Sequence, residues 1–487
     1  MTDTVPDLRI RNVNAAPLNA RGDFVLYWMI AARRASFNFA LDHALALAKT
    51  LGKPLVVLEA LRVDHPHAND RLHAFVLEGM ADNQAQFEAS PVHYHPYVEP
   101  SSGAGAGLLS ALSSRACAVV TDEFPSYFLP RMVEAAGKKL AVRLEAVDSC
   151  GLYPLAATDR TFVSAFSFRA HLQKELLPHL AAFPKERPLA RLDLPRAANL
   201  TRLLSRWPKA SPATLSAHPA ALATLPVDHS VPPTAFRGGS RAARARLESF
   251  VTQKLARYLG DRNEPELDGT STLSPYLHFG HLSAHEVFSR IASAEGWSPG
   301  LLDGPRGGKR EGYWHLSAPA EAFLDQVITW RELAYQAARH GKVHDYPALP
   351  AWARASLEKH LKDPRPHRYT REELEAGRTH DALWNAAQMQ LVRDGWFHGY
   401  LRMLWGKRIL EWSDSPAQAL TTMEALMDKH SLDGRNPASG MGYAWVLGRF
   451  DRPWGPERKI FGAVRYMSSE NTARKFSVDR YVQKYAP

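Results

Sequence analysis

Apolar positions in the first 150 residues form short continuous runs, and longer segments with helical spacing lie between them. Five runs are typical of strands buried on both faces: 24–29, 54–58, 92–95, 116–120 and 140–144. Helical spacing follows the first four runs, at 37–51, 70–87, 107–112 and 127–136. Strands and helices that alternate in this way predict an α/β domain with a doubly wound parallel sheet.

The pattern changes twice after residue 150. Ten prolines between Pro178 and Pro233 exclude long helices there, which predicts an extended connector. Helical spacing dominates from Phe236 onward, and it is clearest at 241–259, 283–294, 320–339 and 383–412. We therefore expect an N-terminal tail, an α/β domain, a proline-rich connector and an all-helical domain, with the bounds 1–20, 21–152, 153–235 and 236–487.

Length and charge change this picture little. The 487 residues exceed what one hydrophobic core usually supports, which agrees with two domains or more. Residues 1–150 contain 14 lysines and arginines against 16 acidic residues, whereas residues 399–487 contain 14 against 9. The basic surplus of the C-terminal part makes a polyanion such as DNA a candidate partner, and an ordinary solvated surface is the alternative.

Cysteine use and hydropathy exclude several classes of protein. The two cysteines, Cys117 and Cys150, cannot form a disulfide framework or a four-cysteine cluster, and they fit a reducing cytoplasm. The N-terminus has no basic run before an apolar core, and no stretch of 18 apolar residues occurs. We expect a cytoplasmic monomer that binds no metal and no membrane.

Two segments are candidates for phosphate binding. The glycine cluster 103–107 follows an expected strand but lacks the G-x-G-x-x-G spacing, so it favours a flexible turn over the nucleotide site of a nicotinamide dehydrogenase. In the segment 269–280, hydroxyl residues stand before a helix that Pro275 initiates. Such hydroxyls and free backbone N–H groups suit a diphosphate, and a plain helix cap is the alternative.

Three tryptophans and one glutamate can each be interpreted either as structural or as functional residues. Trp405 and Trp412 are seven residues apart, so on one helix they share a face about 10 Å apart along the axis, which permits electron hopping as well as core packing. Trp384 begins an earlier segment, and Gly395 and Gly399 permit a bend between the two. Glu332 is either an exposed acid or a buried acid that donates a hydrogen bond.

The segments 398–407, 432–437, 451–454 and 460–467 alternate aromatic residues, arginines and glycines. This mixture suits a site that stacks on flat π-systems and holds phosphates. Read in order, these segments resemble the C-terminal half of class II cyclobutane-pyrimidine-dimer photolyases, in the photolyase and cryptochrome superfamily of flavoproteins. The resemblance covers residues 21 to about 485, and it is specific from Tyr258 onward.

The resemblance implies light-driven repair of UV-damaged DNA. Excited, reduced, non-covalent FAD gives one electron to a flipped-out pyrimidine dimer, the ring splits, and the electron returns. The N-terminal half of such proteins can seat an antenna pigment, whose type the sequence leaves open. The implied cofactor contacts are Tyr258, Thr270, Ser271, Thr272, Leu273, Ser274, Arg402, Met427 and Asp433.

The resemblance also assigns the remaining roles. The lesion is contacted by Glu332, Trp445 and Met403, and a relay of Trp384, Trp405 and Trp412 reduces the flavin from the surface inward. The implied DNA-facing residues are Arg262, Arg435, Asp451, Arg452 and Arg465, with Arg262 paired to Asp451.

Two departures from the family keep an alternative open. Met427 stands where photolyases usually place an asparagine that faces flavin N5, and Tyr335 and Gln336 replace an acidic residue and an asparagine. A thioether cannot exchange a hydrogen bond with N5–H as an amide does. The alternative is therefore a cryptochrome-type blue-light photoreceptor that keeps FAD and the relay. A helicase-like DNA-binding protein is a third class, but the chain has no G-x-x-x-x-G-K-[ST] loop.

Overall fold

The computed structural model describes residues 5–198 and 200–487, which fall into two compact units. Unit 1 contains residues up to 159, 175–248 and 273–293, and unit 2 contains 160–174, 249–272 and 294–487. Most of the expected connector thus belongs to unit 1, and the chain passes between the units at other places than residue 236. Residues 1–4 of the expected tail lie outside the described residues.

A six-stranded sheet with the order β1-β6-β5-β2-β3-β4 forms the centre of unit 1. Its strands are β1 (Ile10–Asn12), β2 (Phe24–Met29), β3 (Leu55–Leu61), β4 (His93–Val98), β5 (Ala116–Glu123) and β6 (Leu144–Asp148). Neighbouring strands are parallel except β1 and β6, where Ile10 pairs with Val147.

The sheet confirms the doubly wound fold and corrects two details of the sequence-based expectation. Strand β1 lies inside the expected tail. The last strand begins at Leu144 and not at Leu140, because the Leu140 N–H still bonds to Ala136 at the end of a helix.

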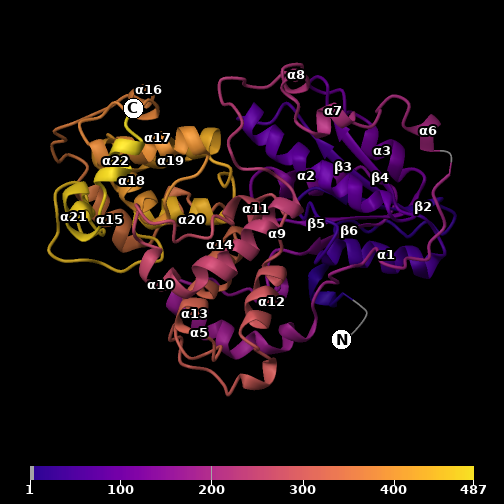
Figure 1. The fold of residues 1–487 in the computed structure, drawn as a ribbon, viewed down its shortest axis with the longest axis horizontal. Helices are drawn as coiled ribbons and strands as arrows, with labels where there is room; N and C mark the ends of the chain where they lie inside the picture. Colours follow the sequence, from indigo (N-terminus) through magenta and orange to yellow (C-terminus); the bar gives the residue numbers. More distant parts are fainter. Residues whose placement is uncertain (1–4, 199) are drawn as a thin grey trace. The chain divides into compact units, whose positions relative to one another are not determined.

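Helices cover both faces of the sheet (Figure 1). Helix α1 (Phe39–Leu51) and the end of α2 (Asp70–Glu88) pack on the face that carries Val25 and Tyr27. Helices α3 (Leu108–Ser113) and α4 (Leu129–Gly137) pack on the face of Leu26 and Trp28. The alternation of inward positions in β2 therefore explains why an uninterrupted apolar strand is buried on both sides.

The topological switch point of the sheet lies between β2 and β5, where such folds bind ligands. The carboxylate of Asp122, in β5, accepts the backbone N–H groups of Ile30, Ala31 and Ala32 at 2.8, 2.7 and 3.0 Å. The Tyr27 hydroxyl donates to the same carboxylate at 2.7 Å. Because the protein's own anion takes these donors, a nicotinamide dinucleotide has no phosphate site there.

The glycine cluster forms the turn that its composition predicted. Gly103 and Gly107 have φ of 79° and 89°, which favours glycine at both positions. Gly105 donates its N–H to Glu99 at 3.0 Å, and the Trp207 indole donates to the Ala104 carbonyl at 3.0 Å.

Between Pro178 and Pro233 the α-helices are short, as the prolines predict, but the expected connector 153–235 also contains the 11-residue helix α5 (Ala165–Glu175), which the sequence pattern did not predict. The three described α-helices of this proline-rich part have four residues each and are α6 (Leu200–Leu203), α7 (Pro212–Leu215) and α8 (Pro219–Leu222). Unit 1 also contains α11 (Ser274–His278), and α9 (Ser240–Ser249) and α12 (Ala284–Ala294) except for the last residue of each, which is grouped with unit 2.

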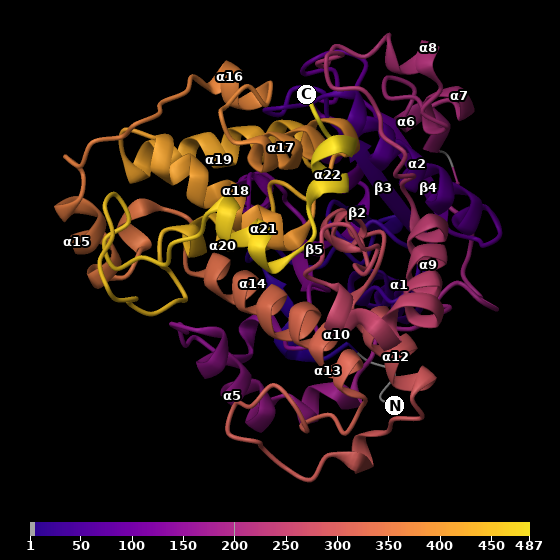
Figure 2. The ribbon, with the colours of Figure 1, turned by 60° about the vertical axis from the view of Figure 1, so that its left-hand side comes forward.

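Unit 2 is helical, as expected. Its helices are α5 (Ala165–Glu175), whose last residue is grouped with unit 1, α10 (Tyr258–Asp261), α13 (Ala318–Leu324), α14 (Arg331–Arg339), α15 (Ala351–Lys359), α16 (Arg371–Glu375), α17 (Ala382–Asp394), α18 (Gly399–Trp412), α19 (Pro416–His430), α20 (Pro437–Val446), α21 (Ser469–Lys475) and α22 (Asp479–Lys484). Helices α17, α18 and α19 lie side by side (Figure 2).

Three of the expected long helices are interrupted. The expected helix 241–259 is divided into α9 and α10 by a π-helical turn over Phe250–Lys254 and a 3-10 turn over Leu255–Arg257. A π-helical turn over Asp325–Trp330 separates α13 from α14, and Gly395, with φ of 69°, ends α17 before α18 begins. Within the described ranges no helix has both the length and the apolar character needed to cross a bilayer.

Candidate functional site

An ion pair between Arg402 and Asp433 lies in the helical unit. Arg402, in the first turn of α18, has its Nη2 atom 2.9 Å from Oδ2 of Asp433. Asp433 is 2% exposed and also accepts the Ser431 hydroxyl at 2.6 Å. Arg402 Nε donates to the Phe397 carbonyl at 3.2 Å. Burial of a charge pair is costly, so this arrangement is a candidate for ligand binding.

The polar groups around this pair fit a flavin ring. Burial raises the pKa of Tyr443 well above its usual value, so the phenol is neutral, and its buried hydroxyl has no partner within the described structure. Burial and then Arg402 lower the pKa of His398 to about 4, so its imidazole is neutral at pH 7. A cation, a neutral phenol and a neutral imidazole suit the carbonyl and nitrogen acceptors of the FAD ring system.

Met427 lies in α19 and is 2% exposed. The turn that carries Asp433 approaches it closely, since a Cβ atom on Gly434 would lie 2.6 Å from the Met427 carbonyl oxygen. Met427 shares a hydrophobic core with Trp405. That its thioether faces flavin N5 stays a prediction.

Aromatic rings run from the ion pair toward the surface of unit 2. The Arg402 guanidinium lies 5.1 Å from the centroid of the Phe397 ring, which lies 5.7 Å from that of Trp405. Trp405 is parallel to Trp384, with centroids 6.4 Å apart, and Trp384 lies 5.2 Å from Trp412. The three predicted relay residues are thus in contact, with Trp384 between the other two.

The next ring outward is Tyr369, which sequence spacing could not identify. Its centroid lies 5.1 Å from that of Trp412, and its oxygen lies 2.6 Å from Nδ1 of His380. The His380 backbone N–H donates to the same hydroxyl at 3.0 Å, so the phenol oxygen contacts two nitrogens of His380. Phe397, Trp405, Trp384, Trp412 and Tyr369 are called the aromatic chain below.

Two hydrogen bonds fix the inner tryptophans. The Trp384 indole N–H donates to the Trp405 carbonyl at 3.0 Å, and the Trp405 indole N–H donates to Oε1 of Gln388 at 2.8 Å. Asp381 caps α17 by accepting the Trp384 backbone N–H at 3.0 Å. All three relay tryptophans are at most 4% exposed.

The three predicted lesion contacts lie on helices that pack together. Glu332, in α14, is 2% exposed, which excludes the exposed-acid interpretation, and α14 packs against α20. Trp445 is half-buried near the end of α20. A Cβ atom on Gly442 would lie 3.7 Å from the methyl group of Met403 in α18, so Met403 lies beside the helix of Trp445.

Arginines and indoles alternate next to Trp445. The guanidinium of Arg465 lies 5.3 Å from the Trp445 centroid and 3.9 Å from that of Trp454, and Arg452 covers Trp454 at 4.4 Å. Asp451 binds Arg465 at 2.8 and 3.1 Å. Arg452 is exposed, so this group offers positive charge beside an aromatic wall.

Two expectations about these arginines are wrong. Asp451 pairs with Arg465 and not with Arg262, whose guanidinium lies 5.7 Å from the Tyr258 centroid. Arg435 is 9% exposed and donates to the carbonyls of Asp428 and Ser431, at 2.9 and 3.4 Å. It stabilises the C-terminal end of α19, where unsatisfied carbonyls attract a cation, so it is not a surface contact for DNA.

The hydroxyl segment is divided between the units. Tyr258 and residues 270–272 belong to unit 2, and Leu273 and Ser274 belong to unit 1. Leu273 occupies the N-cap of α11, and no side chain caps this helix, so the helix-cap interpretation of the hydroxyls is wrong. Their binding of a diphosphate stays a prediction.

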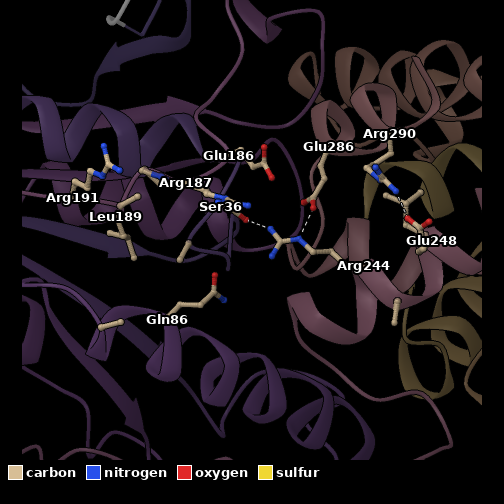
Figure 3. Close-up of a pocket in the computed structure, with 16 residues that line it drawn as sticks. Ser36, Gln86, Glu186, Arg187, Leu189, Arg191, Arg244, Glu248, Glu286 and Arg290 are labelled. Carbon is tan, nitrogen blue, oxygen red and sulfur yellow. Dashed lines mark hydrogen bonds and ion pairs between the residues drawn. The ribbon is translucent and has the colours of Figure 1, made fainter. Parts of the chain in front are cut away.

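A separate cavity of about 830 Å³ lies within unit 1 (Figure 3). Arg244 points between Ser36 and Glu286, and Arg290 points to Glu248, so ion pairs occupy its polar lining. None of the predicted site residues lines it. Residues 5–198 and 200–487 contain no group of three or more metal-ligating side chains.

Comparisons with known proteins agree on one family. The chain is 34% identical to the deoxyribodipyrimidine photo-lyase of Methanothermobacter thermautotrophicus, over 98% of this chain and 97% of that protein. It is 32% identical to the deoxyribodipyrimidine photo-lyase of Oryza sativa, over 95% of this chain and 87% of that protein. No family model matches the sequence.

Solved structures show the same fold. A bacterial class III photolyase from Agrobacterium tumefaciens matches 95% of this chain and 86% of its own, with a TM-score of 0.62 and 17% identity. An archaeal photolyase from Sulfolobus tokodaii, described with two FAD molecules, matches 95% of this chain and 90% of its own, with a TM-score of 0.60 and 14% identity.

Proposed function

The chain belongs to the deoxyribodipyrimidine photo-lyase family, and on that premise we propose that it is a class II-type enzyme that splits cyclobutane pyrimidine dimers in UV-damaged DNA under light. The observation that carries this proposal is the aromatic chain between the Arg402–Asp433 pair and Tyr369. When bound in its reduced form, non-covalent FAD supplies the photoexcited electron for ring opening.

Most of the residues that hold the cofactor in this proposal belong to unit 2. Arg402, oriented by Asp433, places a positive charge beside the flavin ring and favours its anionic, reduced form. Tyr443 donates a hydrogen bond to the ring, and Met427 contributes an apolar contact. Tyr258 and the hydroxyl segment 270–274 hold the diphosphate. An antenna pigment would belong to unit 1, as the resemblance implies.

Other residues of unit 2 bind the lesion. Glu332, buried on α14, donates a hydrogen bond from its protonated form to a carbonyl of the dimer, where negative charge develops. Trp445 and Met403 form the apolar wall that a flipped-out dimer needs. Arg452 and Arg465 contact phosphates, and Asp451 orients Arg465.

A cryptochrome-type photoreceptor is the second candidate, and one observation favours it. Met427 is buried, with 2% exposure, and it stands at the position where the resemblance places an asparagine whose amide bonds to flavin N5 in photolyases. The cationic and aromatic group around Trp445 favours repair, because a sensor has no need of a lesion wall beside exposed arginines.

Repair is tested with purified protein, FAD and an oligonucleotide that contains one thymine dimer. Chemically reduced protein should restore the intact thymines under blue light and not in the dark, as measured by chromatography of the oligonucleotide. Glu332→Gln should reduce the yield without loss of FAD. Bound, reduced FAD without any repair would instead support the photoreceptor.

A further inference from the structure

A lysine is buried inside the helical unit directly beneath the predicted lesion wall. Lys407, in α18, is 0% exposed, and its ammonium lies 5.3 Å from the centroid of the Trp445 ring. Its Nζ donates to the Val446 carbonyl at 2.5 Å, which is its single hydrogen-bond partner in the described part of the chain. Lysine is almost never fully buried without an acidic partner, so this side chain needs an explanation.

Close packing of α18 on α20 brings Lys407 to this place. A Cβ atom on Gly406 would lie 2.5 Å from a methyl group of Val446, so only glycine permits this approach. The last turn of α20 then offers its free carbonyls to the ammonium. The Trp445 indole therefore has two basic side chains near it, Lys407 from the interior side and Arg465.

The charge of Lys407 is easily changed. Burial lowers its pKa to about 7, and the charged groups that act on it are Asp451, which raises the pKa, and Arg465, which lowers it. Both belong to the segment that follows α20. Near neutral pH the ammonium is therefore half-deprotonated, and an anion that arrives beside Trp445 favours the protonated form.

We propose that Lys407 is a positioning residue for the lesion wall, which holds Trp445 from the interior and takes up a proton when dimer-containing DNA binds. This inference rests on the proposed function, since it assigns Trp445 to the lesion pocket. Proton uptake follows from linkage, because a bound polyanion stabilises the charged lysine more than the neutral one. If DNA raises the pKa of Lys407 by one unit, the dissociation constant rises about tenfold from pH 6 to pH 9.

The test is calorimetric titration of the FAD-bound protein with dimer-containing and intact oligonucleotides, in buffers of different ionisation enthalpy, at pH 6 to 9. For a shift of one unit the wild type should take up about half a proton with the dimer between about pH 7 and pH 8. Lys407→Gln, which keeps a donor for the Val446 carbonyl without the charge, should abolish most of this uptake and flatten the pH dependence. Lys342→Gln, a change at an exposed lysine, is the matched control and should behave as the wild type.

The outcomes separate the inference from the proposed function. Undiminished proton uptake in Lys407→Gln overturns the inference alone. Loss of uptake in a Lys407→Gln variant that still binds FAD, and is therefore folded, supports it. A wild type that binds FAD but does not prefer dimer-containing DNA overturns the proposed function, and the inference falls with it. Lys407→Met should melt no lower than the wild type, because it removes a buried charge.

Discussion

Replacement of Trp384 by phenylalanine should stop light-driven reduction of the bound flavin. Trp384 is 0% exposed and lies between Trp405 and Trp412, at centroid distances of 6.4 and 5.2 Å. Without an oxidisable ring there, the electron must pass directly between Trp405 and Trp412, seven residues apart on α18 and separated by about 10 Å along the axis. Two short steps are thus replaced by one step about as long as both together.

The cost to folding should be modest. The substitution leaves the Trp405 carbonyl without the indole donor at 3.0 Å, which costs about 1–3 kcal/mol. Trp207→Phe is the matched control, because this buried indole of unit 1 donates to the Ala104 carbonyl at the same distance. The assay follows the flavin absorbance under blue light with an external reductant and no oxygen. Photoreduction at the wild-type rate in Trp384→Phe would refute the relay, while repair by chemically reduced Trp384→Phe should persist.

Three further predictions concern neighbouring groups. Arg402→Ala should release FAD and lower the free energy of unfolding by about 3–5 kcal/mol, because buried Asp433 loses the cation of its ion pair; retention of the yellow colour and of the melting temperature would contradict this. Tyr369→Phe should speed charge recombination after a light pulse, as followed by transient absorption, because it removes the outermost oxidisable ring. His380→Leu should do the same, because Nδ1 of His380, 2.6 Å from the phenol oxygen, is the base to which an oxidised Tyr369 would lose its proton; unchanged decay in both would exclude Tyr369 as a donor. His430 and then Lys429 lower the pKa of Glu375 to about 2, below its unfolded value. This stabilisation is complete above about pH 4.5 and is lost as the pH falls toward 2, so Glu375→Gln should melt lower at pH 7 and show a smaller fall in melting temperature on acidification.

The sequence predicted the sheet because buried parallel strands leave continuous apolar runs, and β2 is a clear case. It did not predict β1, because three residues are too few to show a pattern. This strand also joins the sheet only by pairing with β6, which lies far along the chain. Likewise, Trp405 and Trp412 follow from spacing on one helix. Their link through Trp384 depends on the packing of α17 on α18, which no local pattern encodes.

The same limit explains the errors among the arginines. A sequence shows that Arg435 is charged but not that its guanidinium turns inward to the end of α19. Arg465 and Asp451 are 14 residues apart, and their pairing follows from an irregular segment without periodicity. Tyr369 joins the aromatic chain from a loop, so its contact with Trp412 is visible only in three dimensions.

The tryptophans of unit 2 have two opposite environments, and this contrast suits two opposite roles. Trp384 and Trp405 donate to carbonyl oxygens, and no lysine or arginine lies over either ring or over Trp412 in the described structure. A carbonyl stabilises positive charge on an indole but is not basic enough to remove its proton, so such a ring can lose an electron and regain it. Trp445 instead has Arg465 and, in its protonated form, Lys407 near its ring, and cations at these places oppose the loss of an electron. In the proposed function, this contrast keeps the lesion wall from donating electrons and leaves the buried indoles of the aromatic chain free to do so.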